Sequence, residues 1–368
     1  MRLTWDQVFA WRLERQFVTA PAGTVSEVVE RLAGVQAQVT SSAETAVALR
    51  SSTPAPGALV RELNEGTLIK TWAMRGTLHA LTPALAAACL SLIASARTWE
   101  KPVWERNFGA SPAEVAALTD EVRRVLDGKT LTREELVAAI VADPGFERLG
   151  EQLRSGWGAL LKPLAWQGAI CHGPAKGNKI TFTDPAQSIK DWPGLPEPDD
   201  AAPQAILAYL GAYGPATPET FDAWLSRGSL RKTVLRRWFS ELGAALTEVE
   251  VEGRTGYVRT GDLEQLAATR PGTSVHLLGG FDQYVLGPGT GDSVLLPGDH
   301  RAKVSRTAGW ISPIVVAGGR IVGTWELAED AVVLSMFDDA PVPKRGLDAA
   351  LDRLAVALGR DTLPVRAG

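Results

Sequence analysis

The two residues best placed to do chemistry are Gln36 and Gln38, which stand two positions apart in the segment 34–42. A primary amide both donates and accepts hydrogen bonds, so two amides facing one pocket can orient a water molecule or a polar ligand. Two buried amides without partners would be costly, so either the fold or a ligand must satisfy them. On the local pattern alone, the simpler interpretation is a polar junction between two helices whose amides bond to the backbone.

The flanking sequence predicts that a helix ends between the two glutamines. A capping-box pattern at 24–27 is followed by apolar residues at helical spacing, and Gln36 continues their inward-facing row. On a continuing helix Gln38 would point away from Gln36, whereas residues i and i+2 of an extended segment share a face. A second capping-box pattern at 41–44 predicts that the next helix begins there and runs to about residue 49.

Length and composition describe a multidomain globular protein of a reducing compartment. The chain has 368 residues with 45% apolar content, which is enough for two to four small domains. Its two cysteines, Cys89 and Cys171, are far apart, which argues against a disulfide framework. The polar N-terminus is not typical of a signal peptide, and no apolar run reaches membrane length. We therefore expect a cytoplasmic protein without a membrane partner.

Helices followed by a β-hairpin occur three times along the chain, without a strict sequence period. The first set has a helix capped by Thr4 and Gln7, the two helices around the glutamines, a helix at 56–64 and a hairpin within 67–81 that turns at Gly76. The second set has helices at 113–126, 132–142 and 149–167 and a hairpin at 169–183. After a Pro- and Asp-rich linker at 184–202, the third has helices at 203–213, 218–225 and 230–242 and strands at 246–251 and 257–260. This order is typical of winged helix-turn-helix domains.

The last hundred residues change to a β pattern. Strands are predicted at 276–278, 284–286, 294–296, 310–316, 320–326 and 331–337, with a tight turn at 317–319 and a closing helix at 343–358. The predicted fold is α+β, with tandem winged helix-turn-helix domains followed by a C-terminal β-barrel-like domain. We place the first winged helix, with the glutamine motif, at 1–108, the second at 109–190, the third at 200–265 and the β-domain at 270–368.

The motifs of ordinary hydrolases and metalloenzymes do not stand out. The four histidines show no paired ligand spacing, so we predict no metal, and no phosphate-binding glycine loop or other cofactor motif is present. Basic residues cluster on three of the predicted modules. The candidates for DNA binding are Lys176, Lys179, Lys232, Arg236, Arg237, His300, Arg301 and Lys303. Each cluster alone could be a solvated face, and such side chains would mainly hold phosphates.

Four stretches together resemble one known family. These are Gln36-Ala37-Gln38, the hairpin 72–79, the segment 277–282 and the motifs at 309–313 and 323–325. They are similar to the AlkZ family of winged-helix DNA glycosylases over nearly the whole chain. The resemblance implies that Gln36 and Gln38 form the catalytic motif, with Thr40, Ser41, Arg75 and His79 as candidates for the surrounding shell. A sister branch has aspartate at the second position, so Gln38 places the chain with the crosslink-associated branch.

The implied activity is monofunctional hydrolysis of the N-glycosidic bond of N7-alkylated purines and unhooking of azinomycin-type interstrand crosslinks. An N7-alkylated guanine is cationic and leaves as a neutral base, so it needs little help from a general acid. Two neutral amides that position a water therefore suit an activated lesion better than a normal nucleoside. A crosslinked base cannot be flipped freely, so an open site would be required. The implied partner is damaged double-stranded DNA, bound by a monomer.

Two other classes of function remain open from the residues. One is a non-enzymatic winged-helix regulator, against which the net charge of −4 and the lack of a heptad dimerisation helix both count. The other is a resistance protein that sequesters an electrophilic drug in its β-domain.

Overall fold

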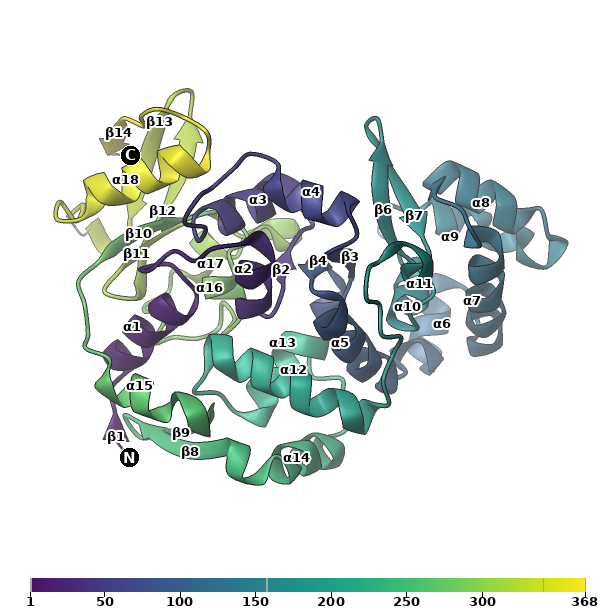
Figure 1. Cartoon of the computed structure of the whole chain (residues 1–368), viewed down its shortest axis with the longest axis horizontal. Coiled ribbons are helices and arrows are strands. Elements are labelled where there is room, and N and C mark those ends of the chain that lie inside the picture. Colours follow the sequence, from purple (N-terminus) through teal and green to yellow (C-terminus); the bar gives the residue numbers. More distant parts are fainter. Residues whose placement is uncertain (1, 157, 340, 368) are drawn as a thin grey trace. The chain divides into compact units, whose positions relative to one another are not determined.

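A computed structural model describes residues 2–156, 158–339 and 341–367, and it is a mixed α+β fold (Figure 1). The chain divides into two compact units, which are described separately. Unit 1 comprises residues 1–60, 206–224 and 239–368, and unit 2 comprises 61–205 and 225–238. Each unit is built from distant parts of the sequence, because the chain leaves unit 1 at residue 60 and returns to it twice.

The N-terminal part of unit 1 contains β1 (Arg2–Leu3), α1 (Trp5–Arg15), α2 (Val25–Arg31), β2 (Val35–Gln36) and α3 (Thr40–Ala48). The predicted capping boxes of α1 and α2 are both confirmed, since Thr4 and Gln7, and Thr24 and Glu27, make reciprocal bonds. The prediction that a helix ends between the glutamines is wrong in position, because α2 already ends at Arg31.

The predicted Ser41–Glu44 capping box is also wrong. Helix α3 begins one residue earlier, at Thr40, and the capping position is held by Val39 without a side-chain bond. The Glu44 carboxylate instead accepts a hydrogen bond of 2.9 Å from the backbone N–H of Val60, in α4 (Ala58–Asn64). Glu44 therefore serves the first turn of a different helix, whose amide groups lack intrahelical partners.

The C-terminal part of unit 1 holds a five-stranded sheet curled as a half-barrel, in agreement with the predicted β-barrel-like region. Its strands follow the chain order β10 (Val275–Leu278), β11 (Ile314–Ala317), β12 (Arg320–Ala328), β13 (Ala331–Met336) and β14 (Val365–Ala367). The hairpin turn between β11 and β12 is confirmed. Helix α18 (Leu347–Ala357) packs beside β10 and α3 (Figure 1).

Two of the predicted strands are absent from this sheet. The segment predicted as a strand at 284–286 belongs to α16 (Gln283–Leu286), which Asp282 caps by accepting from the N–H of Tyr284 at 2.8 Å. Residues 294–296 are not in a strand either. The strand predicted at 310–316 starts only at Ile314, because α17 (Arg301–Val304) and a tight loop precede it, and β14 was not predicted.

The remainder of unit 1 comes from the middle of the chain. Helix α12 (Pro198–Tyr213) starts in unit 2, inside the predicted linker 184–202, and enters unit 1 at residue 206. Helix α13 (Pro218–Ser226) follows the predicted Thr217 cap, and all but its last two residues belong to unit 1. Strands β8 (Leu246–Val251) and β9 (Arg254–Arg259) form the predicted hairpin, but β9 begins three residues earlier than predicted, so the turn is shorter. Strand β1 pairs with β8 in parallel. Helix α15 (Leu263–Ala268) then leads into the half-barrel.

Unit 2 contains a hairpin, a helical group and a second hairpin. The first hairpin is β3 (Ile69–Trp72) and β4 (Leu78–Leu81), as predicted. The helices are α5 (Pro83–Ser95), α6 (Pro102–Phe108), α7 (Pro112–Leu126), α8 (Arg133–Val141), α9 (Gly150–Arg154), α10 (Leu161–Trp166), α11 (Pro185–Ser188) and the first part of α14 (Lys232–Glu241). The second hairpin is β6 (Cys171–Lys176) and β7 (Lys179–Thr183), with β5 (Leu131–Thr132) beside β7.

The single helix predicted at 149–167 is wrong. It is broken into α9 and α10, and Gly158 lies between them with a left-handed φ of +61°. A Cβ at this glycine would come within 2.6 Å of the Trp72 ring, so the close packing of the break on Trp72 requires glycine. Trp157, which the prediction placed in the helix, lies outside the described residues.

No helix in the described parts of the chain is long and apolar enough to cross a bilayer.

Candidate active site

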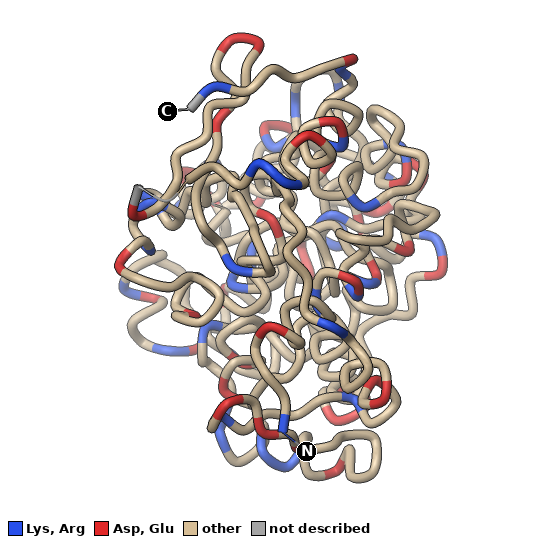
Figure 2. The backbone as a smooth tube through the Cα atoms, turned by 90° about the vertical axis from the view of Figure 1, so that its left-hand side faces the viewer, with Lys and Arg blue, Asp and Glu red and all other residues tan. Residues whose placement is uncertain are grey.

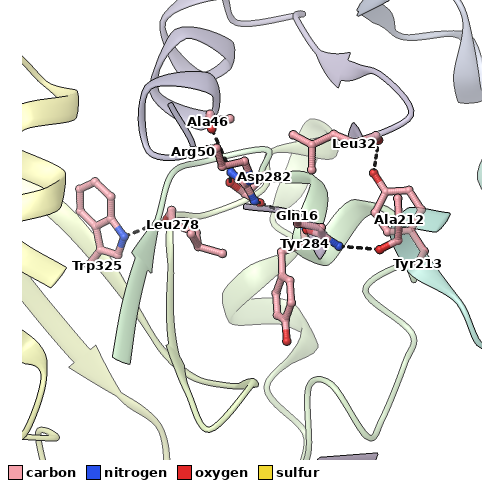
Figure 3. Close-up of polar contacts among 10 residues, drawn as sticks. All are labelled: Gln16, Leu32, Ala46, Arg50, Ala212, Tyr213, Leu278, Asp282, Tyr284 and Trp325. Carbon is pink, nitrogen blue, oxygen red and sulfur yellow. Dashed lines mark hydrogen bonds and ion pairs between the residues drawn. The ribbon is translucent and has the colours of Figure 1, made fainter. Parts of the chain in front are cut away.

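The Gln36-Ala37-Gln38 motif lies in the short extended segment between α2 and α3. After α2, Ala33 and Gly34 take successive left-handed φ values of +51° and +100°. These two residues reverse the chain, and the N–H of Gly34 closes the turn on the Val29 carbonyl at 2.9 Å. The Leu32 carbonyl accepts a hydrogen bond from the Tyr213 hydroxyl (Figure 3). Two hydrogen bonds, one to the preceding helix α2 and one from Tyr213, therefore hold the backbone that leads into the motif.

Burial within the motif ends at its last residue. Val35 and Ala37 are buried apolar residues, whereas Gln38 is exposed. Gln36 is 6% exposed, and no hydrogen bond joins its amide to any residue that the structure describes. Its amide atoms are not among those sealed from solvent. Gln36 thus presents a polar group at the edge of the core, where a water or a ligand must satisfy it.

Thr40 and Ser41 follow the motif after Val39, in the first turn of α3, and both are exposed. The structure therefore brings four of the predicted site residues together within one short segment of unit 1.

Arg75 and His79 belong to unit 2 and lie on the β3–β4 hairpin. Arg75 has a left-handed φ of +57° in the turn. His79 is fully buried, and its Nδ1 lies 3.0 Å from the Thr77 carbonyl oxygen. Burial, reinforced by the positive charge of Arg75, lowers the pKa of His79 to about 3. His79 is therefore neutral in the folded protein and is not placed to exchange protons with solvent.

His79 and His172 should make unit 2 sensitive to acid. Burial lowers the pKa of His172 to about 3 as well, so both imidazoles stay neutral in the fold but take up protons near pH 6.5 when unfolded. The unfolded state then binds more protons between pH 6.5 and 3. The free energy of unfolding is fully retained above pH 6.5 and falls below it, by at most about 1.4 kcal/mol per pH unit for each histidine. Urea unfolding at pH 7 and pH 5 measures this, and His172→Phe should flatten the dependence. An unchanged slope in that variant would contradict the assignment.

The basic candidates fall into three short segments, and acidic residues are interspersed with the basic ones along the chain (Figure 2). On α14, Lys232 and Arg236 are exposed and have no ion-pair partner among the described residues. Arg237 instead holds Asp199 through two hydrogen bonds of 2.6 and 3.0 Å. Its charge is thus already partly neutralised within unit 2.

Among the basic candidates on the β6–β7 hairpin and on α17, some are also paired within the protein and others are exposed. Lys176 donates to the Thr130 carbonyl at 2.8 Å and lies 3.5 Å from the Glu135 carboxylate, while Lys179 is exposed at the hairpin turn. In unit 1, His300 stacks on Phe337 and lies 2.9 Å from the Asp338 carboxylate. Its neighbours have exposed side chains, those of Arg301 and Lys303. Lys179, Lys232, Arg236, Arg301 and Lys303 thus remain the candidates whose charges are open to a phosphate.

An ion pair that sequence reasoning missed fixes α3 against the C-terminal region. Arg50 and Asp282 are both fully buried, and two hydrogen bonds of 2.8 and 2.7 Å join them (Figure 3). One arm of the guanidinium also donates to the Ala46 carbonyl at 3.0 Å. The pair ties the end of the helix that follows the glutamines to the loop before α16. No local pattern could have found it, because the two residues are 232 positions apart.

Gly34 should be intolerant of a side chain, because its φ of +100° lies in a region that L residues rarely adopt. We expect Gly34→Ala to lower the free energy of unfolding by about 1–3 kcal/mol and to slow the reaction by displacing Gln36. Urea unfolding and single-turnover kinetics measure the two effects. Gly261→Ala is the matched control, because Gly261 lacks a left-handed φ and has open space around it. Equal free energies of unfolding in the two variants would show that alanine at position 34 causes no backbone strain.

The comparisons identify the class of protein. The family model for DNA glycosylase AlkZ-like proteins matches residues 29–360. The chain belongs to this family of DNA glycosylases, enzymes that hydrolyse N-glycosidic bonds. This membership favours the enzyme over the regulator and the drug-sequestering protein.

In the described residues, no group of three or more His, Cys, Asp or Glu side chains is close enough to hold a metal ion.

A protein of Streptomyces sahachiroi and its solved structure are similar to this chain from end to end. The curated protein, described as an interstrand DNA cross-link repair glycosylase, is 54% identical over 371 residues, which cover 100% of both sequences. The solved structure of Streptomyces sahachiroi DNA glycosylase AlkZ superposes with a TM-score of 0.97 and covers 100% of both chains.

Proposed function

We propose that this protein hydrolyses the N-glycosidic bond of N7-alkylated purines in duplex DNA and unhooks interstrand crosslinks of the azinomycin type. The observation that carries the proposal is the full-length similarity, at 54% identity, to an interstrand cross-link repair glycosylase. The amide of Gln36 supports it, because this buried group has no hydrogen-bond partner among the described residues and so offers a site for a water close in the chain to the exposed Gln38.

In this proposal Gln36 and Gln38 position the hydrolytic water at C1′ of the damaged nucleotide. An N7-alkylated purine carries a positive charge and leaves as a neutral base, so bond cleavage needs little general-acid assistance. Each amide offers both a donor and an acceptor, which can fix the orientation of the water without deprotonating it. The site thus favours a lesion that is already activated and leaves normal nucleosides intact.

Thr40 and Ser41 are proposed as polar neighbours of that water, because they are exposed and lie two and three residues after Gln38. For Arg75 and His79 we propose a supporting role in the surrounding shell. A neutral, fully buried His79 can hold the hairpin in place but is poorly suited to proton transfer.

We further propose that the helix–hairpin sets are tandem winged helices that cradle the duplex through its phosphates. The proposed modules are residues 1–108, 109–190 and 200–265, followed by the β-domain at 270–368. The exposed cations on α14, on the β6–β7 hairpin and on α17 support this arrangement, since phosphate contacts supply most of the affinity of such interfaces. The protein would act as a monomer on the DNA of the cytoplasm.

The proposal is tested by single-turnover release of 7-methylguanine from a duplex, next to an undamaged duplex of the same sequence. We expect free 7-methylguanine and an alkali-labile abasic site from the damaged duplex only. Tight binding to both duplexes without base release would contradict the proposal and favour a regulator.

A further inference from the structure

A hollow of about 690 Å³ lies in unit 1 beside the first turn of α3. One wall contains Ser41, Ser42 and Thr45 of that helix. The loop Gly279-Gly280 adjoins this wall so closely that a Cβ on Gly279 would lie 3.3 Å from the Thr45 side chain. Ser41 follows Gln38 by three residues, so one part of the lining is close in the chain to the proposed catalytic motif, although neither glutamine lines the hollow.

The lining of the hollow also includes two cations and an exposed aromatic ring. Lys303 and Arg306 line it, and both are exposed. Trp310 is 46% exposed, and its ring meets Phe281 edge to face with centroids 5.0 Å apart. A tryptophan left this exposed at the mouth of a hollow is typical of a binding surface, because its large apolar face gains little from water. Glu326, from β12, is also in the lining and places a negative charge on part of the rim.

The loop before β11 holds Trp310 in this position. Ala308 and Gly309 adopt left-handed φ values of +57° and +75° in succession. The Trp310 carbonyl accepts from the Arg306 N–H at 2.8 Å, and the Trp310 N–H donates to the Thr307 carbonyl at 3.3 Å. A left-handed alanine is strained, and such strain is common where a side chain must be presented in a set direction. The ring is therefore preorganised before any ligand arrives.

We infer that this hollow binds one unstacked nucleotide of the substrate DNA, beside the nucleotide that is cleaved. Its base stacks on Trp310, and Lys303 and Arg306 hold the adjoining phosphates. Every base has a face that can stack on an aromatic ring, so this contact tolerates any sequence, and the nearby cations supply the backbone contacts. Glu326 would repel a phosphate on its side, which limits the backbone to the cationic wall. This inference rests on the proposed glycosylase function.

Removal of the ring should weaken productive binding without removing the chemistry. We expect Trp310→Ala to raise the protein concentration for half-maximal 7-methylguanine release about tenfold or more, from the usual strength of base–aromatic stacking. The rate at saturating protein should change much less, and Trp310→Phe should retain most of the affinity. Arg270→Ala is the control, because Arg270 is exposed in unit 1 and does not line the hollow.

A second measurement separates stacking from a merely structural role. The test uses a set of duplexes that carry 2′-fluoro-7-methyldeoxyguanosine, whose glycosidic bond resists hydrolysis. In each duplex the fluorescent base 2-aminopurine replaces a different base next to the lesion. We expect the fluorescence of the bound DNA to differ between wild type and Trp310→Ala at one position only, where the base loses its quenching partner. Base release with equal half-maximal concentrations and equal fluorescence in both proteins would overturn this inference alone. No base release by the wild type would instead overturn the proposed function.

Discussion

Replacement of Gln38 by alanine is expected to slow single-turnover base release at least about 100-fold, and replacement of Gln36 should have a comparable effect. Either change removes one of the two groups that orient the water, and loss of orientation costs about this much in rate. Binding to the damaged duplex should stay nearly unchanged, because neither amide carries charge to the phosphates. Rates measured over a protein titration separate the two effects.

Gln265→Ala is the matched control, since this exposed glutamine belongs to a different element, α15. Full activity in both the Gln36 and the Gln38 variants would remove the motif from the mechanism. A loss confined to the Gln36 variant would assign the water to Gln36 and leave Gln38 without a role in orienting it.

The second large effect is expected at the buried ion pair. Asp282→Asn leaves the fully buried Arg50 guanidinium without its counter-charge, which should lower the free energy of unfolding by about 3–5 kcal/mol. Asp330→Asn is the control, because the Asp330–Arg360 pair is at the surface and its loss should change stability little. Urea unfolding monitors both variants.

A double variant separates the buried charge from the lost contact. Arg50→Met combined with Asp282→Leu removes both charges, so it should be less destabilising than Asp282→Asn alone. If the double variant is less stable than Asp282→Asn, the hydrogen bonds and packing of the pair contribute more to stability than the neutralisation of the two charges.

The parts of this fold that depend on neighbouring residues could be predicted from the sequence. The capping boxes of α1 and α2 and the β3–β4 and β6–β7 hairpins depend on contacts over a few positions, and all four are present. The position of the glutamines between two helices was also predictable, although α2 ends earlier than expected, because the left-handed Ala33 and Gly34 reverse the chain first.

The errors arise where distant residues decide the local structure. The Ser41–Glu44 cap fails because the Glu44 carboxylate is bonded to Val60. The apolar residues at 284–286 have the composition of a strand but form a helix, since Asp282, fixed by Arg50, caps it. The hollow with Trp310 could not be predicted from any one local pattern, because its lining comes from α3, the loop before β11 and the half-barrel strands.

The most direct test of the central claim is the incubation of the wild-type protein with a duplex that carries a single azinomycin-type interstrand crosslink. Denaturing electrophoresis then reports whether the two strands separate and whether one carries an abasic site. The proposed function predicts separated strands with an abasic site from the wild type, and intact crosslinks with the Gln38→Ala protein. Crosslinks that stay intact with the wild type, while 7-methylguanine is released, would restrict the protein to simple alkyl lesions. If the wild-type protein leaves both the crosslinked duplex and the 7-methylguanine duplex unchanged, the proposed function is wrong.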